Sequence, residues 1–129
     1  MTILTAATEI CPTSTQKWIA NGALLVDVRE ADEVAQLAFD VPNIINIPLS
    51  QFEERFAEVP TDREVVLVCR SGGRSLKATY YLHNHGYDTA KVVNMKLGIE
   101  RWVQKGFPVK GDSSIVSGGG SCCSAGGCC

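Results

Sequence analysis

Residues 64–76 read EVVLVCRSGGRSL, and this stretch decides the fold class. The apolar run Val65–Val68 is too short for a helix and suits a strand that is covered on both faces. A glycine pair ends the run, and residues 75–85 then show a helical pattern that stops at Gly86. A buried strand that turns sharply into a helix is one unit of a parallel β/α arrangement.

The rest of the chain repeats this alternation. The patterns predict further strands at residues 23–28, 43–47 and 91–94, and helices at residues 16–20, 31–39, 51–57 (capped by Ser50) and 99–105. We therefore predict an α/β fold with a central parallel sheet flanked by helices. Ligands of such sheets bind beyond the carboxyl ends of the strands, where Cys69 falls.

Length and charge limit what the protein does. The chain has 129 residues, which is enough for one domain of the usual ~100–200 residues. Its 14 acidic and 12 basic residues give a net charge of −2, which argues against binding to nucleic acid or to a membrane surface. The composition changes at Asp112, and we predict a folded domain at residues 2–111 and a flexible Gly/Ser/Cys tail at residues 112–129.

The cysteines indicate an intracellular protein rather than a disulfide scaffold. Four of the six lie in the tail, so they cannot bridge the loops of a small secreted domain. The first residues, MTILTAATE, lack the basic and apolar segments of a signal peptide, and no apolar run is long enough to span a membrane. We predict a cytoplasmic protein whose thiols stay reduced.

Cys69 is the candidate nucleophile. It stands where a buried strand meets a glycine-rich loop and a helix, so backbone amides after it are able to converge on its sulfur. Glycines let the loop curl into a nest of N–H groups that binds an anion, and Arg70 and Arg74 add positive charge. All three effects favour the thiolate.

A thiolate in such a cradle attacks phosphorus or accepts a sulfur atom as a persulfide. Cysteine phosphatases place five residues between the cysteine and an arginine, which gives the loop room for phosphate. Here Arg74 comes after four residues, and the position after five is Ser75. The spacing favours sulfur, and a phosphatase or arsenate reductase remains the alternative enzyme.

Four motifs together resemble a single-domain rhodanese, which is a sulfurtransferase, over about residues 5–110. They are LLVDVRE (24–30), INIPL (45–49), CRSGGRS (69–75) and GIERWVQKGFPV (98–109). The resemblance implies that Cys69 carries a persulfide, that thiosulfate or a similar anion is the donor, and that cyanide, a thiol or an acceptor protein takes the sulfur. It implies no required cofactor. The residues that it assigns to persulfide and donor binding are Arg70, Ser71, Gly72, Gly73, Arg74 and Ser75.

The resemblance also implies that Asp27 and Arg29 organise the edge of the active site. An exposed ion pair of little energetic weight is the alternative for these two residues. Glu30 and Glu33 are expected to be solvated charges at the start of a helix. The chain departs from the family where Asp40 replaces a histidine and Leu97 replaces a glycine, both expected near the rim of the site.

The tail cysteines Cys122, Cys123, Cys128 and Cys129 have three open interpretations. They belong to a disordered end, they bind a soft metal ion such as Zn(II) or Cu(I), or they accept sulfur from Cys69. A non-enzymatic carrier of sulfur or soft metal that uses these thiols is the second alternative function.

Overall fold

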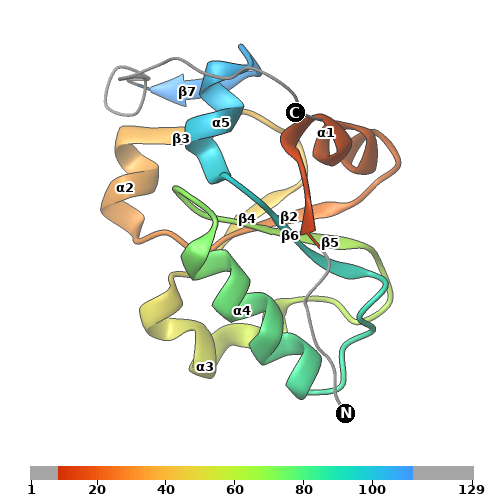
Figure 1. Cartoon of the computed structure of the whole chain (residues 1–129). Helices are drawn as coiled ribbons and strands as arrows, with labels where there is room; N and C mark the ends of the chain where they lie inside the picture. Colours follow the sequence, from red (N-terminus) through yellow and green to blue (C-terminus); the bar gives the residue numbers. More distant parts are fainter. Residues whose placement is uncertain (1–8, 112–129) are drawn as a thin grey trace.

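A computed structural model of the chain describes residues 9–111 (Figure 1). The strands are β1 (Glu9–Ile10), β2 (Leu24–Asp27), β3 (Leu37–Phe39), β4 (Ile44–Asn46), β5 (Val65–Val68), β6 (Val92–Met95) and β7 (Val109–Gly111). The α-helices are α1 (Pro12–Ala20), α2 (Ala31–Gln36), α3 (Phe52–Arg55), α4 (Gly73–Asn84) and α5 (Gly98–Gln104). Two short 3₁₀ helices, η1 (Leu49–Gln51) and η2 (Phe56–Glu58), flank α3.

The central sheet confirms the predicted fold class. Its strands lie in the order β1-β6-β5-β2-β4, and every neighbouring pair is parallel. Strand β5 lies in the middle, with β6 on one side and β2 on the other. The residue that follows it, Cys69, therefore lies at the centre of the edge where the carboxyl ends of the strands meet.

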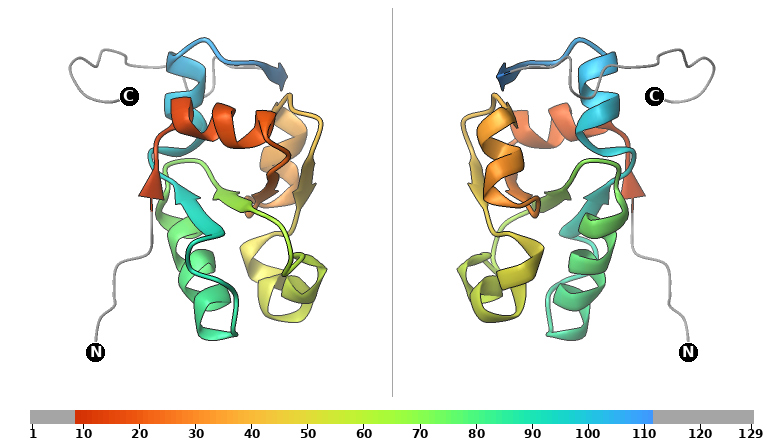
Figure 2. Two further views of the ribbon diagram at one scale, coloured as in Figure 1. Left: turned by 90° about the vertical axis from the view of Figure 1, so that its right-hand side faces the viewer. Right: turned by 90° about the vertical axis from the view of Figure 1, so that its left-hand side faces the viewer.

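Helices cover both faces of this sheet (Figures 1 and 2). Successive side chains of a strand point to opposite faces, so Val65 and Leu67 enter the core beneath α3 and α4. Val66 and Val68 enter the core on the other face of the sheet, together with Ile99 and Trp102 of α5. All four residues of β5 are buried, which explains why its sequence is a continuous apolar run instead of an alternating one.

The prediction of a helical segment at residues 31–39 was wrong for its last third. Helix α2 ends at Gln36, and residues Leu37–Phe39 form β3, which pairs antiparallel with β7. Phe39 also packs edge to face against Trp102, with ring centroids 5.1 Å apart. These partners lie about sixty to seventy residues further along the chain, and such contacts override local helical periodicity.

The expected helix at residues 51–57 is divided into η1, α3 and η2. Ser50 does not cap it, because the Ser50 hydroxyl donates instead to the Glu30 carboxylate at 3.0 Å. This contact ties the segment to the start of α2, whose Glu33 binds Arg74 of the loop that follows Cys69.

Candidate active site

The sulfur of Cys69 lies in a buried cradle at the end of β5. Cys69 is 1% exposed, and the Gly72 amide donates to its Sγ at 3.0 Å. The Ser75 hydroxyl lies 3.3 Å from the same sulfur. Helix α4 begins at Gly73, so both groups come from the turn that leads into a helix and from its first residues. Oriented N–H and O–H donors of this kind stabilise negative charge on sulfur.

Two glycines allow the loop to take this shape. Gly72 has a φ of +104°, and a Cβ there would lie 2.9 Å from the Leu97 backbone nitrogen. Gly98 has a φ of +58°, and a Cβ there would lie 2.2 Å from the Arg70 carbonyl oxygen. The sequence predicted the need for glycine in the loop itself, while the role of Gly98 depends on how α5 approaches it.

The start of α5 holds the backbone of the loop. The Ile99 amide donates to the Cys69 carbonyl at 2.9 Å, and the Glu100 amide donates to the Arg70 carbonyl at 3.2 Å. These bonds satisfy carbonyls that follow a buried strand, and they fix the peptide that carries Cys69.

Both arginines of the loop pair with carboxylates of the chain. Arg74 binds Glu33 through two hydrogen bonds of 2.7 and 2.9 Å, and Arg70 Nε lies 3.0 Å from Glu100. The hydrogen bonds from Arg74 lower the pKa of Glu33 from 4.5 to about 2, and they raise the pKa of Arg74. Glu33 therefore is not the solvated charge that the sequence led us to expect. Donor binding by the two arginines stays a prediction.

Asp27 and Arg29 form a buried ion pair, which overturns the exposed alternative. Arg29 donates from Nη2 to Asp27 Oδ2 at 2.7 Å and from Nε to Oδ1 at 3.0 Å, and their side chains are 3% and 1% exposed. Asn46 donates to the carbonyls of both residues at 2.8 and 2.9 Å. Because Asp27 pairs with Val68 across β2 and β5, the ion pair lies at the same carboxyl edge of the sheet as Cys69.

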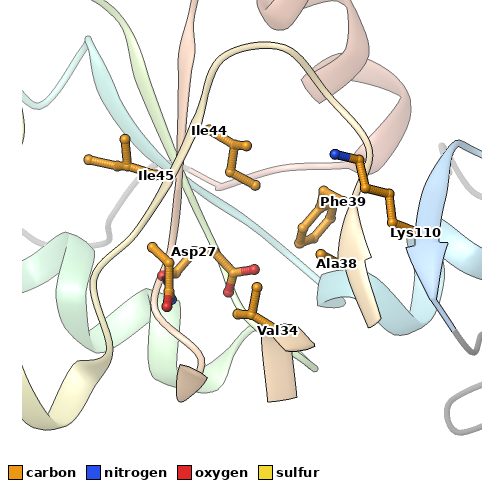
Figure 3. A pocket seen from close by; sticks show the side chains of 8 residues that line it. Asp27, Val34, Ala38, Phe39, Ile44, Ile45 and Lys110 are labelled. Carbon is orange, nitrogen blue, oxygen red and sulfur yellow. Dashed lines mark hydrogen bonds between the residues drawn. The ribbon is translucent and has the colours of Figure 1, made fainter. Parts of the chain in front are cut away.

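A hollow of about 190 Å³ opens beside this ion pair, between β4 and the α2–β3 segment. Figure 3 shows Asp27 facing the hollow together with Val34 of α2 and Phe39 of β3. The lining is mainly apolar, and the Arg29 guanidinium lies 5.7 Å from the Phe39 ring centroid. The ion pair thus lies in a mainly apolar setting, and its role in organising the active site stays a prediction.

Residues 12–105 match the sequence model of the family described as Rhodanese-like domain. The chain belongs to the rhodanese-like family. Among its relatives, a sulfurtransferase of Allochromatium vinosum is 41% identical over 86 residues, which cover 67% of this chain and 77% of the relative. A putative sulfurtransferase of Bacillus subtilis is 36% identical over 78 residues, which cover 60% of this chain and 71% of the relative. These relatives support sulfur transfer in general.

Solved structures agree with the rhodanese-like assignment. A rhodanese-related protein of Thermoplasma volcanium superposes with a TM-score of 0.70 at 28% identity, covering 80% of this chain and 97% of its own. A polysulfide-sulfur transferase of Wolinella succinogenes superposes with a TM-score of 0.69 at 25% identity, covering 82% and 80%. The resemblance drawn from the four sequence motifs is thereby confirmed.

The two departures from the family lie in different places. Leu97 lies against Gly72 of the rhodanese-like loop, and it is 44% exposed with a φ of +70°. Asp40 follows β3, where its carboxylate lies 3.9 Å from Lys110 of β7. Leu97 is thus on the rim of the cradle, whereas Asp40 lies beside the small two-stranded sheet.

Sequence reasoning missed a polar pair behind the cradle. Asn94 of β6 is fully buried, its Oδ1 accepts from the Ser75 hydroxyl, and its Nδ2 donates to Glu9 at 2.8 Å. The available signal was an asparagine in the middle of a predicted strand, a position that β propensity disfavours.

The predicted tail site lies outside the described residues. That holds for Cys122, Cys123, Cys128 and Cys129 alike. Within residues 9–111, no group of three or more His, Cys, Asp or Glu side chains is placed to hold a metal ion. The same part of the chain has no helix that is both long and apolar enough to cross a membrane.

Proposed function

We propose that this rhodanese-like domain is a thiosulfate-type sulfurtransferase in which Cys69 carries sulfane sulfur as a persulfide. The observation that carries the proposal is the position of Sγ, 3.0 Å from the Gly72 amide nitrogen and 3.3 Å from the Ser75 hydroxyl, at the carboxyl end of β5. Donors aimed at one sulfur in a buried site stabilise an anion there with little reorganisation. The named sulfurtransferases among the relatives support the same class of reaction.

The first step loads the enzyme. The Cys69 thiolate attacks the outer sulfur of thiosulfate, a new S–S bond forms, and sulfite leaves with the electron pair of the bond that breaks. The negative charge then lies on the terminal sulfur of the persulfide. Both reactants are anions, so the Gly72 amide and the polar groups of the loop lower the barrier by stabilising the charge at the sulfur.

The second step transfers the outer sulfur of the Cys69 persulfide to an acceptor. Cyanide, a thiolate or the thiol of an acceptor protein attacks the terminal sulfur, and the electron pair of the S–S bond returns to Cys69 Sγ. The acceptor leaves as thiocyanate or as a new persulfide. Atoms and electrons balance without an external oxidant, so the proposal includes no required cofactor.

Phosphoryl transfer is the less favoured chemistry for this loop. Arg74 donates from both Nη1 and Nη2 to the Glu33 carboxylate, so the two nitrogens that could bind an anion together point toward α2. A phosphatase needs such a pair of nitrogens for the phosphate oxygens. The same reasoning applies to an arsenate reductase that binds a tetrahedral oxyanion.

The test compares two cysteine variants. Cys69→Ser is expected to abolish cyanide-dependent formation of thiocyanate and the gain of one sulfur atom in intact mass after incubation with thiosulfate. Cys11→Ser is the matched control, because Cys11 is also buried but lies at the N-terminus of α1. Activity that survives in Cys69→Ser would refute the mechanism.

Two other outcomes would point to the alternatives. Vanadate-sensitive release of phosphate from an aryl phosphate, without sulfur transfer, would favour the phosphatase. Loading of one sulfur with no turnover toward cyanide or thiols would favour a sulfur carrier. The tail cysteines as internal acceptors, a soft metal ion on them, and a cytoplasmic location stay predictions from the sequence.

A further inference from the structure

The Ser75 hydroxyl has one proton and three acceptors. Its oxygen lies 3.3 Å from Cys69 Sγ and 3.2 Å from the Gly72 carbonyl oxygen, and it also contacts Asn94 Oδ1. Ser75 is fully buried, so water does not compete for this proton. The hydroxyl therefore donates to whichever of the three acceptors is strongest at the time.

The orientation of the Asn94 amide is set by its other partners. Its Nδ2 donates to the Glu9 carboxylate at 2.8 Å and lies 3.4 Å from the Gly72 carbonyl oxygen, so Oδ1 faces Ser75. Asn94 lies in β6, whose backbone pairs with β1 at Glu9 and with β5 at Leu67. A side chain anchored in this way presents a fixed acceptor to the Ser75 hydroxyl.

The strength of the sulfur acceptor changes during the proposed reaction. In the thiolate from which the proposed reaction starts, the negative charge lies on Cys69 Sγ, which makes that atom the strongest acceptor for the Ser75 proton. In the persulfide the charge lies on the terminal sulfur, and Sγ becomes a weak, neutral acceptor. The Ser75 proton then needs another partner, and Asn94 Oδ1 is already in contact with the hydroxyl.

We propose that Asn94 is a positioning residue that accepts the Ser75 hydrogen bond when Cys69 is loaded with sulfur and so favours the persulfide over the free thiolate. The proposal rests on the proposed function. Without Asn94 Oδ1, the hydroxyl stabilises the thiolate fully but has only the Gly72 carbonyl as a good acceptor in the persulfide. Loss of this acceptor shifts the loading equilibrium toward the free enzyme.

The experiment measures the ratio of loaded to free Cys69 by intact mass, in fixed mixtures of thiosulfate and sulfite. Asn94→Val removes the acceptor and keeps a residue that suits a buried strand. We expect the ratio to fall by about 3- to 10-fold, as for one hydrogen bond of ordinary net strength. Asn94→Ala provides a second variant with the same expected direction, and circular dichroism verifies that each variant is folded.

Ser75→Ala supplies the decisive control through a double-mutant cycle. The Ser75→Ala protein has no hydroxyl that donates to Asn94. Adding Asn94→Val is therefore expected to change the ratio of loaded to free Cys69 by less than about twofold. An equal fall with and without the Ser75 hydroxyl would show a merely structural role of Asn94 and overturn the proposal. An unchanged ratio for Asn94→Val in the protein that keeps Ser75 would overturn it too. A wild-type protein whose Cys69 takes up no sulfur would instead contradict the proposed function.

Discussion

Replacing Gly98 by alanine is expected to push a methyl group into the backbone of the loop that carries Cys69. An ideal Cβ at this position lies 2.2 Å from the Arg70 carbonyl oxygen and 2.6 Å from the Cys69 carbonyl oxygen. Comfortable contacts between heavy atoms are about 3.5 Å, so the loop and α5 must separate by about 1 Å. That movement breaks the 2.9 Å hydrogen bond from the Ile99 amide to the Cys69 carbonyl.

Two costs add in this variant. A side chain in the left-handed region costs about 1–2 kcal/mol, and Gly98 has a φ of +58°. Forcing extra volume into a packed region costs about 1–3 kcal/mol more. We therefore expect the free energy of unfolding to fall by about 2–5 kcal/mol. Because a displacement of about 1 Å at a catalytic group lowers rates by about 100-fold, sulfur transfer is expected to fall by a similar factor.

Gly86→Ala is the matched control. Gly86 also has a positive φ, +91°, but a Cβ there meets nothing within 4 Å, and it lies at the other end of α4 from the cradle. This variant carries the conformational cost without the collision, so its loss of stability is about 1–2 kcal/mol and its activity is retained. The measurements are urea unfolding and cyanide-dependent thiocyanate formation. Equal stability losses in the two variants, with full activity in Gly98→Ala, would refute the reasoning.

Three other perturbations test separate parts of the site. Asp27→Asn leaves Arg29 buried without its carboxylate, and urea unfolding is expected to show a loss of about 3–5 kcal/mol. Glu33→Gln removes the ion pair with Arg74, at a cost of about 1 kcal/mol or less because the pair is partly exposed. Since the pKa of Glu33 is lowered from 4.5 to about 2, the stability difference from wild type is full above pH 4.5 and disappears as the pH falls through 2. Deletion of residues 118–129 is expected to leave sulfur loading of Cys69 unchanged and to slow its transfer to weak thiol acceptors, which intact mass over time measures.

The fold could be predicted where short-range patterns determine the structure. The four-residue apolar run of β5 followed by a glycine turn and a helical pattern reproduces β5 and α4 closely. Strand β3 could not be predicted because its partner β7 is distant in sequence, and its residues are held by that pairing and by Trp102. Strand β1 has two residues, which is too short to leave a pattern of its own.

The candidate site could likewise be predicted only where its geometry depends on neighbouring residues in the sequence. The cradle around Cys69 follows from consecutive residues, because the strand, the glycines and the helix are all local. The partners of the side chains depend on tertiary structure. Helix α2 brings Glu33 to Arg74, and β6 brings Asn94 to Ser75, across 41 and 19 residues of chain. Burial of Asp27 with Arg29 likewise depends on β4, which pairs with β2, and on Phe39 of β3, whose ring centroid lies 5.7 Å from the Arg29 guanidinium.

The length of the loop determines which side chain faces the sulfur. Helix α4 begins at Gly73, so Arg74 and Ser75 are successive helical residues that point about 100° apart. Ser75 follows Cys69 after five intervening residues, which is the position of the arginine in a cysteine phosphatase. The Ser75 hydroxyl lies 3.3 Å from Cys69 Sγ. Arg74, one position earlier, is turned toward α2 and binds Glu33. A loop shorter by one residue thus places a small hydroxyl beside Cys69 Sγ in place of a guanidinium, and this arrangement supports the proposed persulfide more than it supports phosphoryl transfer.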